Sequence, residues 1–516
     1  MGQAKYKPLS FNTTLRNPER IAGFLKCIEQ FEGKVLTNGL IDGIVKKIIN
    51  EKLYRPKSVN SKELYKTIFD SDDKFNSNQL EDIVKNAPQD HKEAGFDKGW
   101  PSRFDTWYKL LKEFGFIWYK MNEPIAISRL GYKLISAYDN DDYNLTQNIF
   151  LNSMVKYQTK NPFRQTLNDN VPLILLIKVI NRFKKENEAF TGIARQELAF
   201  FICWKNNDDL ELFNYIKEFR KKYCFSKYTE ELIYEKCLQI LGYGEKDKKY
   251  IKKDKIFTET TDEYIRKMRI TGLISLRGIG NFIDINGFKK GKINYILKEY
   301  DNYVLYTDQR EYFDYMSKVD NKLYDDVVCV DEDVKINKLH ELAERYQKED
   351  IKEELKIVIN PRRESKDGLF KFIQAPTRFE FLVSIALVQH FPGIEVLPNY
   401  LTDDEGIPTS HATGGKADIV CIDTASNIDN FVEVTLTKDY RSQMIEIFSI
   451  QDHQLEARKI NKNTYTIFLA PRIHERARRC AMWFKFESDN DIATIDLEEF
   501  VEKIDKVNNL LDFYVM

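Results

Sequence analysis

Two acidic side chains lie in neighbouring apolar segments of the C-terminal third, where their spacing could build a cation site. Asp418 stands immediately before the apolar run 419–422, and after a polar turn Glu433 lies inside a second apolar run, residues 431–436. Adjacent strands of a sheet are about 5 Å apart, so carboxylates on one face of two paired strands can bind one divalent cation. An acid before one strand and an acid within the next is the arrangement of a metal-dependent phosphodiesterase core.

Two more acids and a histidine interrupt apolar segments that are predicted to be helical. Glu380 lies within the apolar stretch 377–388, Glu446 lies between two isoleucines, and His453 follows Glu446 by seven residues, about two turns along the same helix face. Each of these residues taken alone is more often a rim or structural group. A buried carboxylate without a partner is costly, however, so the acids taken together favour a metal site.

The segment that must position these side chains changes to an α/β pattern after Pro376. A helix typical of a buried element comes first, with Thr377 available as its N-cap. A short strand, the two acid-bearing strands, a second helix and a further buried strand follow, over residues 394–399, 418–422, 430–436, 440–460 and 465–470. Helix, strands, helix, strand is the order of elements in an α/β sandwich.

The preceding part of the chain is predicted to be mostly helical, with two helix-and-hairpin patterns. Pro18 suits the first turn of a helix whose apolar residues recur at helical spacing. The first pattern is a helix from about 102, strands at 116–119 and 125–128, and a helix from 129; the second is a helix ending near 272 and a hairpin around 278–280. This is the order of elements in a winged helix. Winged helices bind DNA but also serve as protein-docking or structural modules, so DNA binding stays open on this ground.

A highly charged stretch predicts the main domain boundary. Lysine, glutamate and aspartate dominate from Lys335 to Glu354, which suits an exposed helical connector, and Pro361 and Gly368 then break the pattern. We therefore expect a multidomain chain with a mostly α region at 1–334, a charged linker at 335–372 and an α/β domain at 373–516. Within the first region, the two winged-helix patterns suggest subdomains at about 1–160 and 170–334.

Composition excludes few classes of function. The formal net charge is −1 and 31% of the residues are charged, with basic clusters at 220–222, 246–255, 362–366 and 476–479 that are more typical of solvated helix faces. Charge alone therefore neither supports nor excludes nucleic acid as a partner. The seven cysteines include no Cys-x-x-Cys pair, and no apolar run reaches the roughly 20 residues of a membrane span. We expect reduced thiols, no membrane partner and a cytoplasmic location.

A known nuclease motif is similar to the acid-bearing strands. Asp418 followed by Glu433-Val434-Thr435 resembles the PD-(D/E)xK motif, with Ala417 at the proline position and Thr435 at the lysine position. The whole set is similar to the type IIS restriction endonucleases of the AlwI/BstNBI kind, a family that includes nicking endonucleases. The similar segments are 11–21, 377–380, 416–419, 432–435, Glu446 and His453, in that order. They touch both ends of the chain, so we expect the resemblance to cover nearly all of it.

The resemblance implies a FokI-like layout of domains. An N-terminal region with winged-helix elements would read a short asymmetric site in double-stranded DNA. A C-terminal α/β, restriction-endonuclease-like nuclease domain would cut a fixed distance away, in a bacterial cytoplasm. The catalytic residues that the resemblance implies are Glu380, Asp418, Glu433, Glu446 and His453. Asp418, Glu433 and the backbone carbonyl of Val434 would bind Mg²⁺.

Three points stay open from the sequence. The motif lysine is absent, and Lys416, Lys438 or a second metal ion could replace it. Arg16 and Asn17 are candidates for DNA contact, but base readout depends on docking geometry. Besides DNA, the expected partner is either a second nuclease domain in a transient dimer or a small second subunit.

Two alternatives to a double-strand endonuclease are compatible with the same architecture. The first is a strand-specific nickase or the large subunit of a heterodimeric restriction enzyme, which would convert supercoiled plasmid to open circles rather than linear products. The second is a non-catalytic DNA-binding regulator. The four carboxylates argue against the regulator, because a decayed site has no physical reason to keep them in or beside apolar segments.

Overall fold

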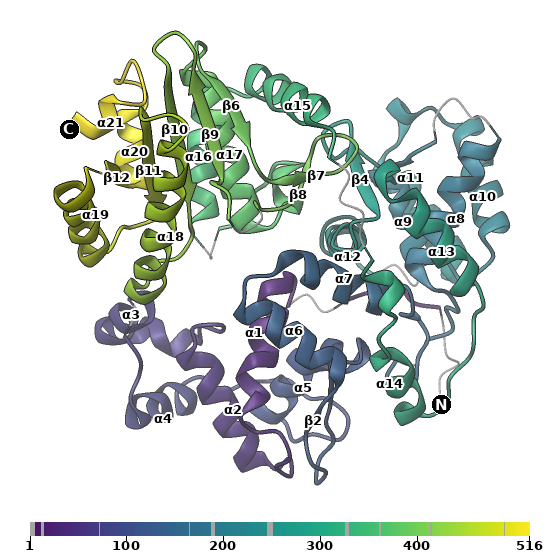
Figure 1. Cartoon of the computed structure of the whole chain (residues 1–516). Helices are drawn as coiled ribbons and strands as arrows, with labels where there is room; N and C mark the ends of the chain where they lie inside the picture. Colours follow the sequence, from purple (N-terminus) through teal and green to yellow (C-terminus); the bar gives the residue numbers. More distant parts are fainter. Residues whose placement is uncertain are drawn as a thin grey trace. The chain divides into compact units, whose positions relative to one another are not determined.

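The chain forms two compact units, residues 1–327 (unit 1) and residues 328–516 (unit 2), which are described separately here. The computed structural model describes residues 6–11, 15–71, 73–164, 166–186, 191–244, 251–325, 330–360, 363–412, 415–489 and 491–515. Residues 12–14, 246–250, Cys329, Pro361 and Arg362, which entered the sequence analysis, lie outside the described residues. Unit 1 is mostly helical and unit 2 contains a five-stranded sheet, so the expected multidomain chain with a C-terminal α/β part is confirmed (Figure 1).

Helices make up most of unit 1. α1 begins at Pro18, whose fixed φ suits a first helical turn, and its Ile21, Phe24 and Leu25 are buried as the periodicity predicts. The helices of unit 1 are α1 (Pro18–Glu29), α2 (Asn38–Asn50), α3 (Glu63–Asp70), α4 (Ser77–Lys85), α5 (Trp100–Glu113), α6 (Arg129–Asp139), α7 (Tyr143–Met154), α8 (Pro172–Lys185), α9 (Leu198–Cys203), α10 (Asp209–Lys222), α11 (Glu230–Leu241), α12 (Thr261–Arg269), α13 (Lys290–Glu299) and α14 (Gln309–Ser317).

Both helix-and-hairpin patterns have their elements in the expected order. In the first, α5 precedes the antiparallel pair β1 (Ile117–Trp118) and β2 (Ala126–Ile127), and α6 follows. In the second, α12 precedes the antiparallel strands β4 (Ile274–Arg277) and β5 (Phe282–Ile285). Strand β5 also pairs with β3 (Ile193–Ala194), which gives a three-stranded sheet in the order β3-β5-β4. The two-residue strand β3 is too short to leave a periodic signal in the sequence.

The turn from α5 into β1 requires a glycine. Gly115 has a φ of +78°, and a Cβ atom added there would lie 2.6 Å from backbone atoms of Met316 and Ser317. The left-handed conformation and the close approach of the end of α14 therefore both exclude a side chain. This contact brings together parts of unit 1 that are distant in the sequence.

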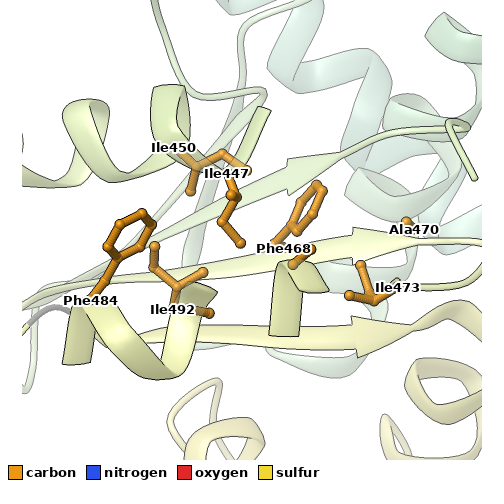
Figure 2. Close-up of a cluster of buried hydrophobic side chains, with 9 residues drawn as sticks. Ile447, Ile450, Phe468, Ala470, Ile473, Phe484 and Ile492 are labelled. Atoms are coloured by element: carbon orange, nitrogen blue, oxygen red, sulfur yellow. The ribbon is translucent and has the colours of Figure 1, made fainter. Parts of the chain in front are cut away.

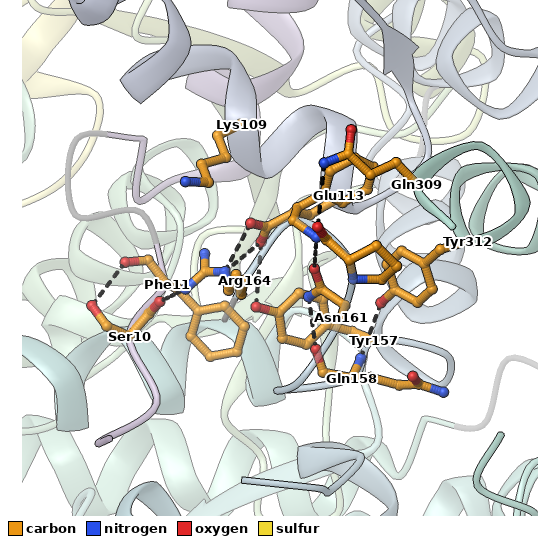
Figure 3. Close-up of polar contacts among 12 residues, drawn as sticks. Ser10, Phe11, Lys109, Glu113, Tyr157, Gln158, Asn161, Arg164, Gln309 and Tyr312 are labelled. Atoms are coloured by element: carbon orange, nitrogen blue, oxygen red, sulfur yellow. Dashed lines mark hydrogen bonds and ion pairs between the residues drawn. The ribbon is translucent and has the colours of Figure 1, made fainter. Parts of the chain in front are cut away.

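A buried ion pair joins the end of α5 to the segment after α7. Arg164 Nε donates to both carboxylate oxygens of Glu113, at 2.8 and 2.9 Å, and Glu113 is fully buried. Tyr157 also donates to Glu113, at 3.4 Å, and an Arg164 Nη donates to the carbonyl of Ser10 (Figure 3). The N-terminal segment, α5 and the segment after α7 are therefore connected through one charged group.

Glu113→Gln is expected to destabilise unit 1 by about 3–5 kcal/mol, because it leaves the Arg164 guanidinium without its counter-charge. Urea unfolding followed by tryptophan fluorescence measures this change, since four of the five tryptophans (Trp100, Trp107, Trp118 and Trp204) belong to unit 1. The control is the double variant Glu113→Gln/Arg164→Met, which removes both charges and should recover most of the loss. Equal unfolding midpoints for Glu113→Gln and the wild type would contradict a structural role for the ion pair.

Unit 2 is built on a mixed sheet in the order β12-β11-β10-β9-β6. β9 is antiparallel to both β6 and β10, whereas β10, β11 and β12 are parallel. The main strands are β6 (Glu395–Pro398), β9 (Ile419–Asp423), β10 (Ile428–Val434), β11 (Thr464–Ala470) and β12 (Ile492–Asp496), with a separate pair β7 (Leu401–Thr402) and β8 (Pro408–Ser410). The helices are α15 (Glu332–Arg345), α16 (Lys348–Val358), α17 (Ala375–His390), α18 (Tyr440–Arg458), α19 (Glu475–Ser488), α20 (Leu497–Lys503) and α21 (Asp512–Val515).

The helices α18 and α19 cover the parallel strands through one apolar cluster. Ile447 and Ile450 of α18 and Phe484 of α19 meet Phe468 of β11 and Ile492 of β12, all nearly or fully buried (Figure 2). The inward faces of both helices are therefore fixed on the sheet by hydrophobic burial.

The predicted exposed linker at 335–372 is not separate from unit 2. The segment contains α15 and α16, which both pack against α17, and Leu339, Leu342, Ile351 and Leu355 are fully buried. Even Lys335 is buried, and its Nζ donates to the carbonyl of Pro398 at 2.8 Å. The charged residues obscured an amphipathic pattern whose apolar stripe faces the core. The contact-defined boundary accordingly lies at 327/328, before this segment.

The predicted N-cap of α17 is one turn too late. The helix begins at Ala375 after Gln374, and Pro376 occupies its first turn. Proline lacks an amide hydrogen and suits this place, so the helix starts before Thr377. Thr377 is consequently a buried residue within the first turn.

Candidate active site

The pairing of β9 with β10 places Asp418 beside Glu433. Val432 pairs with Ile419, so the next residues outward on the two strands are Glu433 and Asp418. The amide of Asp418 donates to Glu433 Oε2 at 3.4 Å, and the amide of Val434 donates to Asp418 Oδ2 at 2.8 Å. Backbone donors thus hold both carboxylates at the same end of the sheet.

Glu380 approaches the same pair from helix α17. Its side chain is only 4% exposed, and Oε2 accepts a hydrogen bond from the amide of Ala412 at 3.2 Å. Burial, and then the charges of Asp418 and Glu433, raise the pKa of Glu380 well above its ordinary value. We therefore consider Glu380 together with the two strand acids.

Asp418 has a similarly perturbed environment. Burial, the charge of Glu433 and, more weakly, that of Glu446 raise the pKa of Asp418 well above its usual range, although the hydrogen bond from Val434 acts in the opposite direction. Like-charged carboxylates at low dielectric disfavour ionisation of one another. We define Glu380, Asp418, Glu433 and Glu446 as the acid cluster.

Helix α18 contributes one side chain to the acid cluster and one beside it. Glu446 Oε1 accepts a hydrogen bond from Thr435 Oγ1 at 3.1 Å, and His453 Nδ1 lies 3.0 Å from Glu433 Oε1. The hydrogen bond with Glu433 raises the pKa of His453, against a smaller effect of burial. The seven-residue spacing thus does bring Glu446 and His453 to the same strand β10.

A threonine stands where the general nuclease motif has a lysine. Thr435 follows β10 directly, and its hydroxyl is the donor to Glu446. The two lysines considered as replacements are both exposed: Lys416 lies in the loop before β9, and Lys438 Nζ donates to the carbonyl of Ile359 at 3.4 Å. Thr435, at the position of the motif lysine, therefore orients Glu446.

The side chains of Asn399 and Gln443, which the sequence analysis did not single out, support the backbone around the acid cluster. Asn399 donates its backbone amide to the carbonyl of Asp418 at 2.8 Å and its side-chain amide to the carbonyl of Ala417 at 2.7 Å. Gln443 is fully buried and donates to the carbonyls of Thr437 and Arg472, both at 2.8 Å. Because both residues bond to the backbone rather than to the acids, no spacing rule could have found them.

The carboxylates present suit Mg²⁺, which needs few protein ligands, better than an ion that the protein must enclose completely. Within the described ranges, no three His, Cys, Asp or Glu side chains are grouped so that they alone could hold a metal ion. Mg²⁺ commonly keeps several waters and takes only one or two carboxylates from the protein. Asp418 and Glu433 present oxygen ligands next to one another, and a divalent cation would offset the charge of Glu433, which adds to burial in raising the pKa of Asp418. The residues present therefore fit this ion.

The two candidate DNA-contacting residues lie against helix α12. Arg16 Nε forms an ion pair with Glu263 at 3.3 Å, and Asn17 Oδ1 accepts from Arg266 at 3.5 Å. The lysine of the same helix, Lys267, is buried and donates to the carbonyl of Arg16 at 3.0 Å. The structure thus gives both residues a role in anchoring the start of α1, and their contact with DNA stays a prediction.

Comparison with known proteins identifies the family. The family model for the AlwI restriction endonucleases matches residues 112–325 and 316–502, so the chain belongs to the AlwI restriction endonuclease family, as the motif resemblance predicted. This is a family of DNA endonucleases. No curated protein sequence matches the chain. Among the described residues, no helix is long and apolar enough to cross a lipid bilayer.

Solved structures of restriction endonucleases are also similar to parts or all of the chain. The small subunit (R.BspD6I2) of the heterodimeric restriction endonuclease R.BspD6I is 22% identical over 31% of this chain and 77% of its own, with a TM-score of 0.26. FokI is 10% identical over 99% of this chain and 98% of its own, with a TM-score of 0.27. FokI bound to DNA is 12% identical over 98% and 97%, with a TM-score of 0.24.

Glu380→Gln is expected to raise the melting temperature of the metal-free protein at neutral pH. The pKa of Glu380 is higher in the folded protein than its ordinary value of 4.5, so the folded state binds a proton more tightly than the unfolded chain does. Ionising this group therefore costs stability increasingly as pH rises above 4.5. The gain from Glu380→Gln should shrink as pH falls towards that value.

Thermal melts in a chelator across this pH range measure the difference. Glu395→Gln, at an exposed position of β6, is the matched control and should leave the melting temperature unchanged. Identical melting curves for the wild type and Glu380→Gln at neutral pH would show that Glu380 is not a strained member of the acid cluster.

Proposed function

We propose that this chain is a type IIS restriction endonuclease. Unit 1 binds a short asymmetric site in double-stranded DNA, and unit 2 hydrolyses phosphodiester bonds a fixed distance away with Mg²⁺ as cofactor. The observation that carries the proposal is the acid cluster itself. The carboxylates come from α17, from the residue before β9, from β10 and from α18, within the part of the chain that the family model covers.

The metal site of the proposal consists of Asp418, Glu433 and the backbone carbonyl of Val434. The amide of Val434 points to Asp418, whereas the amide of Thr435 points to Leu469 on the other side of β10. The N–H and C=O groups of one strand residue point to the same neighbour, so we expect the Val434 carbonyl on the side of Asp418. When bound, Mg²⁺ polarises a phosphate oxygen and lowers the pKa of a bound water.

The remaining residues have positioning roles in the proposal. His453 holds Glu433 Oε1 and so fixes the direction of that carboxylate. Thr435 donates to Glu446 Oε1, and Glu446 is proposed to orient the attacking water or accept its proton. Glu380, whose pKa is raised, accepts from Ala412 and can hold a proton or a second ion beside Asp418.

DNA recognition is assigned to unit 1, with one restriction on how it occurs. In a winged helix, the helix before the hairpin commonly enters the major groove. Here that helix is α12 in the second pattern, and its Lys267 and Arg269 are buried. The second pattern is therefore proposed as a scaffold or a contributor of its hairpin loop, with groove contacts made elsewhere in unit 1.

Asp418→Ala or Glu433→Ala is expected to abolish Mg²⁺-dependent cleavage, because each removes a proposed metal ligand. The assay is digestion of a phage DNA with sequencing of the ends, and a gel-shift on the duplex thus identified should show unchanged binding. Asp423→Ala is the matched control: Asp423 lies at the other end of β9, bonds locally to Ser426, and should be dispensable. DNA cleavage by either of the two variants would contradict the assignment of Asp418 and Glu433 as metal ligands.

Thr435→Val is expected to lower the cleavage rate by about 10- to 100-fold with little change in DNA affinity, because Glu446 loses the group that orients it. Single-turnover cleavage at saturating DNA measures the rate. Thr435→Ser keeps the hydroxyl and should restore most of it. If valine and serine behave alike, the hydroxyl of Thr435 has no part in catalysis.

A further inference from the structure

Unit 1 contains a cavity of about 650 Å³ whose lining comes from three segments that are distant in the sequence. They are the N-terminal segment at 7–10, the segment after α7 at 159–166, and residues 243, 251 and 255 between α11 and α12. Volumes of roughly 300–1,000 Å³ are typical of sites for small organic ligands. The acid cluster belongs to unit 2, so this cavity is a separate site.

The inner wall of the cavity is apolar and is held by the protein itself. Leu9 and Ile251 are both buried. The amide of Leu9 donates to the carbonyl of Ile202 in α9 at 2.7 Å, and the hydroxyl of Tyr234 donates to the carbonyl of Ile251 at 2.5 Å. Because these contacts fix the backbone on two sides, the cavity is formed before any ligand enters.

Two lysines give the mouth of the cavity a positive charge that nothing nearby balances. Lys7 and Lys255 line it, both are exposed, and neither forms an ion pair with a residue that the structure describes. Arg164 is a third cation in the lining, but Glu113 balances its charge. None of the described lining residues is acidic. The cavity therefore suits an anion with about two negative charges.

Arg164 nevertheless provides a hydrogen-bond donor. Its Nε donates to Glu113 and its Nη1 to the carbonyl of Ser10, whereas Nη2 has no acceptor among the described residues (Figure 3). Three further lining positions are serine or threonine. Guanidinium and hydroxyl groups are both common donors to phosphate oxygens.

Lys255 is positioned by an unusual backbone segment. It begins the π-helical segment Lys255–Thr260, in which Ile256 is fully buried and its carbonyl accepts from Thr261 Oγ1 at 2.8 Å. π-Helical turns are rare and are frequent at functional sites. Burial of Ile256 fixes this turn and leaves the preceding Lys255 exposed at the mouth of the cavity.

The remaining lining suits an organic group attached to the anion. The half-buried Tyr243 lines the cavity together with Pro8, Leu9 and Ile251. An aromatic ring in such a place can stack on a nucleic-acid base. A phosphate monoester carries about −1.5 to −2 charges at pH 7, which matches two ammonium groups better than a carboxylate does.

We propose that this cavity binds the terminal phosphate monoester of a nucleotide, with Lys7, Lys255 and Arg164 on the phosphate and Tyr243 on the base. The nucleotide is either free or the end of a DNA strand, since both offer the same group. The proposed function gives this cavity no role, so the inference goes beyond it. A bound phosphate would join the segment before α1 to the segment before α12 and so stabilise unit 1.

Isothermal titration calorimetry of the full chain in EDTA tests the phosphate contacts. AMP should bind at one site, whereas adenosine should give no heat. Lys7→Gln/Lys255→Gln should weaken AMP binding by about 100-fold, because two charge-assisted contacts are lost. Lys57→Gln/Lys85→Gln is the matched control, since it removes two charges from other exposed positions of unit 1 and should leave the affinity unchanged. Equal affinities of the two double variants for AMP would overturn the proposal, as would adenosine binding as tightly as AMP.

Tyr243→Leu tests the place of the base. Loss of one stacked ring should weaken AMP binding by about 10-fold and leave the affinity for ribose 5-phosphate unchanged. An equal loss for both ligands would contradict the assignment of Tyr243 to the base.

A single-stranded tetranucleotide, with and without its 5′-phosphate, distinguishes the two sources of the phosphate. Binding of the phosphorylated form alone, lost in Lys7→Gln/Lys255→Gln, would assign the cavity to a strand end. Binding of AMP without binding of the tetranucleotide would assign it to a free nucleotide. If neither AMP nor the phosphorylated tetranucleotide binds in a manner that depends on the two lysines, the proposal is wrong. Because EDTA withholds the metal ion, none of these results depends on DNA cleavage.

Discussion

The burial of several carboxylates near one another is the constraint around which the candidate site of unit 2 is arranged. Glu380 and Asp418 have raised pKa values because burial and neighbouring acids both oppose their ionisation. Backbone amides of Ala412 and Val434 and the side chain of His453 hold the acids in place by donating to them. Strand pairing, the start of α17 and the loop before β9 all have to be correct for these donors to be present. In the proposed function, a bound divalent cation would offset the negative charge of these acids.

Helix α18 contacts both the acid cluster and the sheet. One face contributes Glu446 and His453, a second packs on the sheet with α19, and the third is exposed and apolar. The threonine at the motif lysine position fits the same picture, because it orients Glu446 rather than adding a positive charge. Thr435 thus connects the end of β10 to an acid of helix α18.

Several basic side chains of unit 1 are held inside the protein by polar contacts. Arg164 neutralises the buried Glu113, and Lys267 anchors the backbone before α1. Burial lowers the pKa of Lys156 to about 7, and its Nζ donates to the carbonyl of Lys318 beyond the end of α14. Side chains held in this way are not part of the basic surface available to a phosphate backbone. The same applies to Arg16 and Asn17, whose contacts are with α12.

The sequence by itself determined the features that depend on local periodicity. These were α1, the α5-to-α6 pattern, the strands β9 and β10 with their acids, and the seven-residue spacing on α18, and the nuclease motif followed from them. Only the tertiary structure decided which groups meet across long separations: Thr435 with Glu446, β3 with β5, and α15 and α16 with α17. It also decided that Ile445, Phe448, Met482, Trp483 and Phe486 of α18 and α19 are exposed. The physical reason is that periodicity identifies the apolar face of an element but not its neighbour. In α15 and α16 the abundant charges concealed even that face, and in α18 and α19 a second apolar stripe is visible only once the first is known to be covered.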